Sequence, residues 1–170
     1  MLDIAGIAGD SIVDGPGIRT TVFAQGCPHH CPGCHNPETW AFGCGTPMEE
    51  DEILNIVAAN PLCKGVTFSG GEPFAQAEGF TTLARLLKRR GYEVASYTGY
   101  TLEALLEGTD AQRELLKSID VLIDGPFLLE QRSLEVCFRG SRNQRILDVP
   151  KSLAAGQAVE ITSGRWIGEY

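Results

Sequence analysis

The segment Gly65–Tyr100, "GVTFSGGEPFAQAEGFTTLARLLKRRGYEVASYTGY", decides the fold because it contains a strand, a helix and a second strand in turn. Two short β-branched and aromatic runs, each ending in polar or glycine-rich sequence, predict strands at Gly65–Phe68 and Val94–Tyr97. Between the two strands, the apolar residues have the i, i+3, i+4, i+7 spacing of an amphipathic helix, at Phe80, Leu83, Ala84 and Leu87. A basic last turn and a glycine stop follow at Lys88–Gly91.

The same alternation continues on both sides of this segment. Further strands are predicted at "TTVFA" (Thr20–Ala24) and "VLI" (Val121–Ile123). "TPME" (Thr46–Glu49) has the pattern of a capping box with proline at the first helical position, and predicts a helix through about Ala59. Two more short helical faces contain Leu102, Leu105 and Leu106, then Leu115, Leu116 and Ile119. The later strands start about 30 residues apart, as βαβ units require. We therefore predict an α/β fold with a parallel sheet, a partial (β/α) barrel shorter than a full eight-fold one.

Length and composition indicate an ordinary globular chain. The 170 residues correspond to a single domain, and 43% of them are hydrophobic. A net charge of −8 argues against nucleic acid as a partner, because phosphate contacts need a basic face. No apolar run has membrane length, and Met1–Asp10 lacks the basic region of a signal peptide. We expect a cytoplasmic protein without membrane contact, in which clustered cysteines form a metal or redox site rather than disulfides.

Four distinctive motifs follow the four predicted strands. A cysteine-rich loop follows the first strand, "SGGEP" (Ser69–Pro73) the second, "TGY" (Thr98–Tyr100) the third and "DGPF" (Asp124–Phe127) the fourth. In parallel α/β folds, sites form outside the carboxyl ends of the strands. The four motifs are therefore expected to form one site.

The cysteine loop, "GCPHHCPGCHNPETW" (Gly26–Trp40), contains three cysteines, Cys27, Cys31 and Cys34. A structural zinc site needs four ligands, and the fourth would have to come from one of the histidines of the loop, His29, His30 or His35. A ferredoxin-like electron carrier usually brings a fourth cysteine nearby, and Cys44, Cys63 and Cys137 are too dispersed for that pattern. Three thiolates on a four-iron cubane would instead leave one iron open to a substrate or cofactor.

The C-x3-C-x2-C spacing resembles the signature of the radical S-adenosylmethionine (radical SAM) superfamily, and Gly70–Glu72 resembles its GGE motif. The resemblance implies a [4Fe–4S] cluster on the three cysteines, whose open iron binds SAM and whose reduction cleaves SAM to methionine and a 5′-deoxyadenosyl radical. It implies no catalytic acid or base, and Glu72 would accept the ammonium of SAM. The SAM contacts it implies are Gly33, His35, Asn36, Gly70, Gly71, Glu72, Ser96 and Thr98. On their own, Asn36 and Trp40 are also explained by packing of the loop, and Thr101 by a helix cap.

Further stretches resemble the activases of glycyl-radical enzymes. "VDGPGIRT" (Val13–Thr20) and "CHNPETW" (Cys34–Trp40) are similar to activase motifs in general. "VLIDGPF" (Val121–Phe127) and "FRGSRNQRILD" (Phe138–Asp148) resemble the branch that activates anaerobic ribonucleotide reductase. The segment between Cys34 and Met48 is too short for the auxiliary clusters of many other activases.

This resemblance implies an enzyme that generates a glycyl radical on anaerobic ribonucleoside-triphosphate reductase, with electrons from a low-potential reductant such as flavodoxin or ferredoxin. The alternatives are an activase of another glycyl-radical enzyme, of the pyruvate formate-lyase type, and a small-molecule radical SAM enzyme such as a deazapurine ring synthase. The resemblance covers about residues 12–148 of the single domain 1–170. Residues 149–170 are left as a C-terminal extension, in which "ITSGRWI" (Ile161–Ile167) predicts a possible hairpin.

The remaining expectations concern a group of arginines and the three cysteines outside the cysteine loop. Arg139, Arg142 and Arg145 form either a solvated face or a positive island that steers an acidic partner or the carboxylate of SAM. Cys63 is expected to be a small buried hydrophobic residue, and Cys44 and Cys137 are expected to have similar structural roles.

Overall fold

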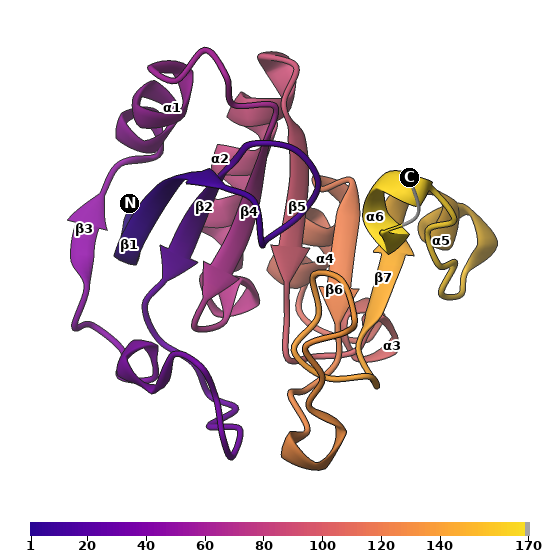
Figure 1. Ribbon diagram of the computed structural model, residues 1–170. Helices are drawn as coiled ribbons and strands as arrows, with labels where there is room; N and C mark the ends of the chain where they lie inside the picture. The colour runs from indigo at the N-terminus through magenta and orange to yellow at the C-terminus, as the bar shows by residue number, and fades with distance from the viewer. Residues whose placement is uncertain (169–170) are drawn as a thin grey trace.

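The computed structural model describes residues 1–168, which build one seven-stranded sheet in the order β3-β1-β2-β4-β5-β6-β7 (Figure 1). The strands are β1 (Leu2–Ser11), β2 (Arg19–Ala24), β3 (Thr46–Met48), β4 (Gly65–Gly70), β5 (Glu93–Tyr97), β6 (Val121–Asp124) and β7 (Arg145–Asp148). The α-helices are α1 (Glu50–Ala58), α2 (Ala77–Arg89), α3 (Leu102–Leu106), α4 (Asp110–Lys117), α5 (Val149–Ala155) and α6 (Gly164–Ile167), and the 3-10 helices are η1 (Pro37–Thr39), η2 (Pro73–Gln76) and η3 (Leu129–Gln131). None of the helices in this part of the chain has the length and apolar character needed to cross a bilayer.

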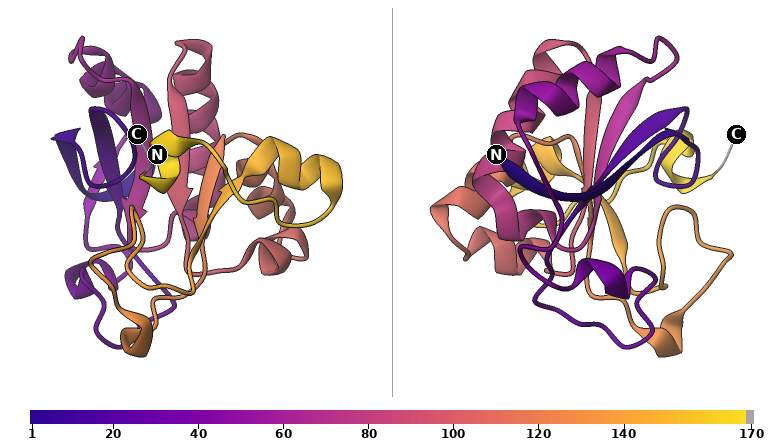
Figure 2. Two further views of the ribbon diagram at one scale, coloured as in Figure 1. Left: turned by 45° about the vertical axis from the view of Figure 1, so that its right-hand side comes forward. Right: turned by 90° about the vertical axis from the view of Figure 1, so that its left-hand side faces the viewer.

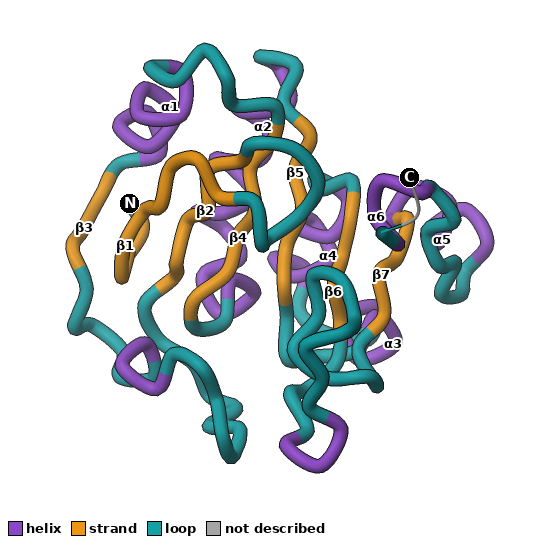
Figure 3. The backbone as a smooth tube through the Cα atoms, in the orientation of Figure 1, coloured by secondary structure: helices purple, strands orange, loops and turns teal. Residues whose placement is uncertain are grey.

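The centre of the sheet is parallel and its edges are antiparallel. Strands β2, β4, β5 and β6 run in the same direction, and their carboxyl ends meet at the lower edge in Figure 3, where the long loops gather. Toward the two ends of the sheet the pairing is antiparallel, because β1 pairs antiparallel with both β2 and β3, and β7 pairs antiparallel with β6. The two edge strands, β3 and β7, lie at opposite ends of the strand order, so the sheet stays open. The predicted α/β fold with a partial barrel is confirmed.

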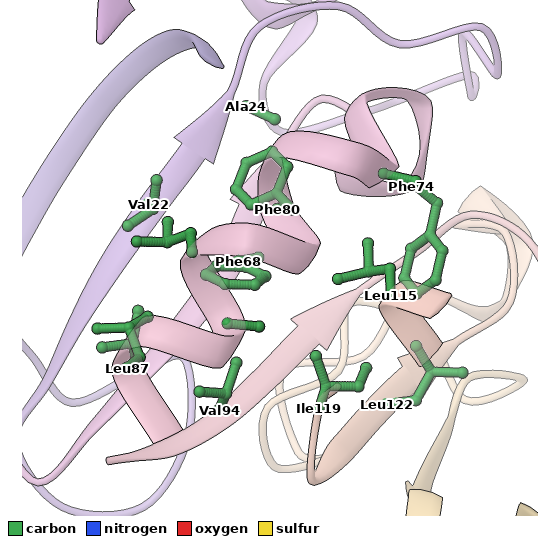
Figure 4. Packing of buried hydrophobic residues seen from close by; sticks show 14 of the residues in the cluster. Val22, Ala24, Phe68, Phe74, Phe80, Leu87, Val94, Leu115, Ile119 and Leu122 are labelled. Carbon is green, nitrogen blue, oxygen red and sulfur yellow. The ribbon is translucent and has the colours of Figure 1, made fainter. Parts of the chain in front are cut away.

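One face of the sheet is covered by the helices of the crossovers, α1, α2 and α4, as the side view in Figure 2 shows. The main core lies between these helices and the strands. Its aromatic centre is the pair Phe68 of β4 and Phe80 of α2, whose ring centroids are 4.7 Å apart, surrounded by aliphatic side chains (Figure 4). The predicted helix with Phe80, Leu83, Ala84 and Leu87 on one face is confirmed, because all four side chains are fully buried.

Two predicted local structures are wrong. Thr46–Met48 does not begin a helix; it forms β3, which pairs with Leu2–Ile4 of β1. Helix α1 begins at Glu50, and its preceding residue Glu49 makes no side-chain cap. The pattern of a capping box is local, whereas pairing with β1 is a long-range interaction that overrides it, and an edge strand tolerates the missing N–H of Pro47. The predicted hairpin at Ile161–Ile167 is also wrong, because Gly164–Ile167 is the short helix α6.

The C-terminal segment covers part of the second face of the sheet. Trp166 of α6 is 2% exposed and packs in a small cluster with Ala95, Val121, Ile123 and Ile146. Its ring lies 5.3 Å from the guanidinium carbon of Arg19. That guanidinium is buried as well, and it donates to Thr67 Oγ1 at 3.0 Å and to Glu93 Oε1 at 2.8 Å. The arginine of the DGPG-x-R motif thus anchors the C-terminal segment to the starts of β4 and β5.

Candidate functional site

A pocket of about 180 Å³ lies at the carboxyl ends of the parallel strands. It takes residues from each of the four loops that the sequence places there, including Cys27, Ser69, Thr98 and Gly125. The expectation that the four motifs form one site is therefore confirmed. Its lining residues are Cys27, His29, Cys31, Cys34, His35, Asn36, Trp40, Ser69, Gly70, Gly71, Tyr97, Thr98, Gly99, Gly125, Phe127, Gly140 and Gln144.

All three cysteines of the loop face this pocket. Cys27 is 9% exposed, and Cys31 and Cys34 are half-buried. Backbone N–H groups point at the sulfurs: that of Asn36 donates to Cys34 Sγ at 3.4 Å. Burial raises the pKa of the Cys27 thiol, the backbone N–H of His29 opposes this rise, and the carboxylate of Glu72 adds to it. Hydrogen bonds to cysteine sulfur are typical of iron–sulfur sites, where they tune the cluster potential, so these residues fit such a cluster.

The geometry of the histidines does not favour the zinc alternative. Across residues 1–168, no three histidine, cysteine or acidic side chains are placed to hold a single metal ion. His30 stacks on Trp40 with centroids 4.7 Å apart, and His35 meets the edge of Phe127 at 5.2 Å. His29 is hydrogen-bonded to Glu72. A cubane places three cysteine sulfurs on three different irons, so it does not require them to converge on one point.

The glycine pair of the GGE motif lies where the chain crosses under the cysteine loop. Gly70 has φ +92°, and a Cβ on Gly71 would lie 2.3 Å from the carbonyl oxygen of Gly26. At this crossing the N–H of Gly71 donates to Ala24 O and the N–H of Glu72 donates to Gly26 O. Only glycine permits so close an approach of two backbones. The glycines therefore allow the GGE loop to pack against the start of the cysteine loop. This close backbone contact is a structural reason for glycine at positions 70 and 71 that the sequence does not reveal.

Glu72 is completely buried, and its carboxylate accepts four hydrogen bonds. Oε1 accepts from His29 Nε2 at 2.6 Å, from Thr98 Oγ1 at 2.9 Å and from the Gly99 N–H at 2.8 Å. Oε2 accepts from the Phe74 N–H at 3.0 Å. Glu72 is not among the residues that line the pocket. Its predicted contact with the ammonium of SAM stays a prediction, and its observed contacts are with the protein itself.

The other predicted SAM contacts divide into two groups. His35, Asn36, Gly70, Gly71 and Thr98 line the pocket, whereas Gly33 and Ser96 do not. A Cβ on Gly33 would meet Leu129 at 2.7 Å, and the buried Ser96 hydroxyl donates to the Tyr97 carbonyl. The predicted cap at Thr101 is confirmed, since its hydroxyl accepts from the Ala104 N–H.

The chain matches the family described as "4Fe-4S single cluster domain" over residues 13–147, which is most of its length. The chain belongs to this family. It is 35% identical over 142 residues to the anaerobic ribonucleoside-triphosphate reductase-activating protein of Escherichia coli K12, a match that covers 78% of this chain and 90% of that protein. Identity to the protein of the same name from Vibrio cholerae is 38% over 144 residues, or 79% and 90% of the two chains. The predicted relation to activating proteins is confirmed.

Two further similarities cover less of this chain. The pyruvate formate-lyase-activating enzyme of Clostridium pasteurianum is 40% identical over 118 residues, which cover 64% of this chain and 50% of that enzyme. The crystal structure of QueE from Escherichia coli superimposes with a TM-score of 0.49 at 19% identity, over 59% of this chain and 53% of QueE.

The motifs "VLIDGPF" (Val121–Phe127) and "FRGSRNQRILD" (Phe138–Asp148) pack on each other. Gln144 donates to the Gly125 carbonyl at 3.0 Å and accepts from the Gly140 N–H at 2.8 Å. Asn143 donates to the Pro126 carbonyl at 2.8 Å. The sequence alone assigns no role to either amide; both tie the Gly140–Gln144 part of "FRGSRNQRILD" to the DGPF loop at the edge of the pocket. Tyr97, another pocket residue that the sequence left without a role, donates its hydroxyl to the Phe138 carbonyl at 2.6 Å, and burial raises the pKa of this tyrosine.

The expected positive island of arginines is largely neutralised by carboxylates. Arg145 forms ion pairs with the buried Asp124 at 2.6 Å and with Glu103 at 2.7 Å. The hydrogen bonds to Asp124, followed by those to Glu103, raise the pKa of Arg145. Arg142 pairs with Glu135 at 3.1 Å. Arg145 thus holds β7 to β6 and α3, and two of the three arginines are paired with carboxylates, whereas Arg139 donates to the Cys137 carbonyl.

Proposed function

We propose that this chain is a radical SAM activating enzyme that generates a glycyl radical on anaerobic ribonucleoside-triphosphate reductase. The observation that carries the proposal is the joint lining of one pocket by Cys27, Cys31 and Cys34 at the carboxyl ends of the parallel strands. The 35% and 38% identities to activating proteins of this reductase support the choice of partner.

Under this proposal the three cysteines hold a [4Fe–4S] cluster with one open iron. The chemistry such a cluster would supply, when bound and reduced, is one-electron reductive cleavage of SAM, whose 5′-deoxyadenosyl group would then take a hydrogen atom from a glycine of the partner. The protein binds and orients the reactants and excludes water, and no side chain has to act as an acid or base. His35, Asn36, Gly70, Gly71 and Thr98 are proposed to contact SAM because they line the same pocket as the cysteines.

We further propose that the glycine segment of the reductase reaches this pocket through an adjoining cleft. The cleft has a volume of about 550 Å³ and shares His35, Tyr97 and Gly140 with the cysteine pocket. Its rim contains Ile12, Val13 and Leu134, of which Leu134 is 88% exposed. Exposed apolar side chains beside a site are typical of a surface that binds another protein. The sheet is not closed into a barrel, which supports access of a macromolecular substrate to this pocket.

The remaining parts of the proposal concern the electron donor, the cellular compartment and nucleic acid. A low-potential reductant such as flavodoxin or ferredoxin is proposed to supply the electron, and the cytoplasm is the proposed compartment. The net charge of −8 supports a protein that does not bind nucleic acid.

Anaerobic reconstitution with iron and sulfide, reduction and an assay for 5′-deoxyadenosine test the chemistry. The Cys31→Ala variant is expected to produce none. Cys44→Ala is expected to behave like the unaltered protein, because Cys44 is exposed, unlike the buried Cys63 whose structural role the sequence predicts it to share, and lies outside the pocket. A normal rate for Cys31→Ala would refute the cluster assignment.

The partner is tested by adding the purified reductase and recording the EPR doublet of a glycyl radical. A radical on pyruvate formate-lyase but not on the reductase would favour the alternative activase. SAM cleavage that depends on a small molecule and needs no partner protein would favour the small-molecule class.

A further inference from the structure

We infer that His29 is a positioning residue, which locks the cysteine loop onto the ends of β4 and β5 through its hydrogen bond to the buried carboxylate of Glu72. This inference rests on the proposed cluster on the three cysteines, but it holds for any partner protein. It assigns to a histidine of the loop a task other than binding metal.

The carboxylate of Glu72 is the point at which three segments meet. His29 comes from the cysteine loop, Thr98 and Gly99 from the end of β5, and Phe74 from η2. The two oxygens of a carboxyl group offer about four lone-pair sites, so these four contacts fill them. Nε2 of His29 is assigned as the protonated ring nitrogen in this contact.

The imidazole of His29 fits closely into the place it occupies. A Cβ added to Gly99 would lie 2.5 Å from ring atom Cδ2 of His29, so glycine at this position makes room for the ring. The ring also meets Tyr100 edge-on, with centroids 4.5 Å apart and an interplanar angle of 74°. The His29 side chain is 18% exposed, whereas Glu72 is fully enclosed. The contact is thus held from three sides and is not a chance surface pair.

The cysteine loop has few other ties to the sheet between its first and last cysteine. Backbone hydrogen bonds fix the start of the loop, where Gly26 donates to Thr39 O and Cys27 donates to Trp40 O. Cys34 donates to Cys31 O, which is a bond within the loop itself. Within the described part of the chain, the bond from His29 to Glu72 is the side-chain hydrogen bond that joins residues 28–35 to another segment. Losing it would free Cys31 from the strand ends and leave the buried carboxyl group of Glu72 short of one hydrogen-bond partner.

The experiment uses the full-length protein without cluster, under anaerobic reducing conditions, and measures hydrogen–deuterium exchange by mass spectrometry. In His29→Leu, the amides of Cys34 and Asn36, which are hydrogen-bonded inside residues 28–36, are expected to exchange about tenfold faster or more, because loss of the bond to the buried Glu72 carboxyl group leaves the loop free to open. In His29→Gln, whose amide keeps a donor, slow exchange is expected to be largely restored. His30→Asn is the matched control, since His30 is exposed and asparagine tolerates its φ of +48°.

A second readout is the iron retained after reconstitution and gel filtration, with the expected order of unaltered protein, His29→Gln and then His29→Leu. Unchanged exchange of residues 28–36 in His29→Leu would overturn the inference. An equal acceleration in α2 would overturn it too, because the bond would then stabilise the whole fold rather than position the loop. The exchange experiment involves neither cluster nor partner, so it can fail or succeed independently of the proposed reaction. Failure of the reaction itself would appear as absence of 5′-deoxyadenosine with the unaltered protein.

Discussion

Replacing Trp166 by alanine tests whether the C-terminal segment is part of the folded core. Trp166 is 2% exposed and lies against the guanidinium of Arg19 and the ring of Phe138, whose centroid is 5.6 Å away. It is also close to Gly15, where an added Cβ would meet its ring at 3.0 Å. One side chain thus packs against the loop before β2, the start of β2 and the loop before β7.

The structure sets the expected magnitude. Removing a fully buried tryptophan side chain costs about 3–5 kcal/mol. The contact with a buried guanidinium and the edge-to-face aromatic pair each add roughly 1 kcal/mol beyond area burial, so the upper part of this range applies here. A domain of this kind is stable by about 5–15 kcal/mol in total. Trp166→Ala should therefore remove a large fraction of the free energy of unfolding.

The assay is urea denaturation of the cluster-free protein, followed by far-UV circular dichroism under reducing conditions. Ile167→Ala is the matched control, because Ile167 is the next residue of α6 and is 38% exposed, and its loss is expected to be below about 1 kcal/mol. A loss for Trp166→Ala as small as that of the control would refute the reasoning, since the tryptophan would then contribute no more than a surface side chain.

Three further predictions follow from contacts described above. Tyr97→Phe is expected to cost about 1 kcal/mol near neutral pH, because the Phe138 carbonyl loses its donor. Burial raises the pKa of Tyr97 in the folded protein, so the free energy of unfolding should fall as pH rises above about 10, where the unfolded tyrosine ionises. Urea titrations across that pH range should show a shallower fall in Tyr97→Phe, which has no hydroxyl at this position to ionise. Arg145→Met should lower the free energy of unfolding by about 3 kcal/mol in urea titrations, because it leaves Asp124 buried without its cation. The double variant Arg145→Met, Asp124→Asn should recover part of this loss, and no recovery would argue against a charge effect. Leu134→Asp at the rim of the cleft should lower the yield of glycyl radical on the reductase while leaving partner-independent SAM cleavage unchanged, and a parallel loss of both would place this residue at the cofactor instead.

The parallel centre of the fold could be predicted because its strands are buried on both faces. Continuous apolar runs such as "VLI" of β6 can be recognised without any knowledge of the neighbouring strands. Strands β1 and β7 could not be recognised in this way. The sequence of β1, "LDIAGIAGDS", contains glycines and acidic residues that weaken a strand pattern, and the strand forms because β2 and β3 pair with it.

The cysteines and the glycine pair of the site could be predicted because their spacing is local. The contacts of Glu72 could not, since its donors lie 43 residues before it at His29 and 26 residues after it at Thr98. The spacing of the cysteines gives His29 no role other than that of a possible fourth zinc ligand. Only the folded chain places the imidazole of His29 beside Glu72.

The two edges of the sheet limit how this protein can meet another one. Strand β3 has three residues and includes Pro47, which has no N–H to offer a further strand. The outer side of β7 is already used by residues 159–161, since Asp148 donates to Val159 O and Ile161 donates to Ile146 O. Short, proline-containing or covered edges protect a sheet against aggregation by strand addition. A partner that binds the described part of the chain is therefore expected to recognise side chains rather than to extend the sheet, and where those side chains lie on loops, substitutions can change specificity without disturbing the sheet.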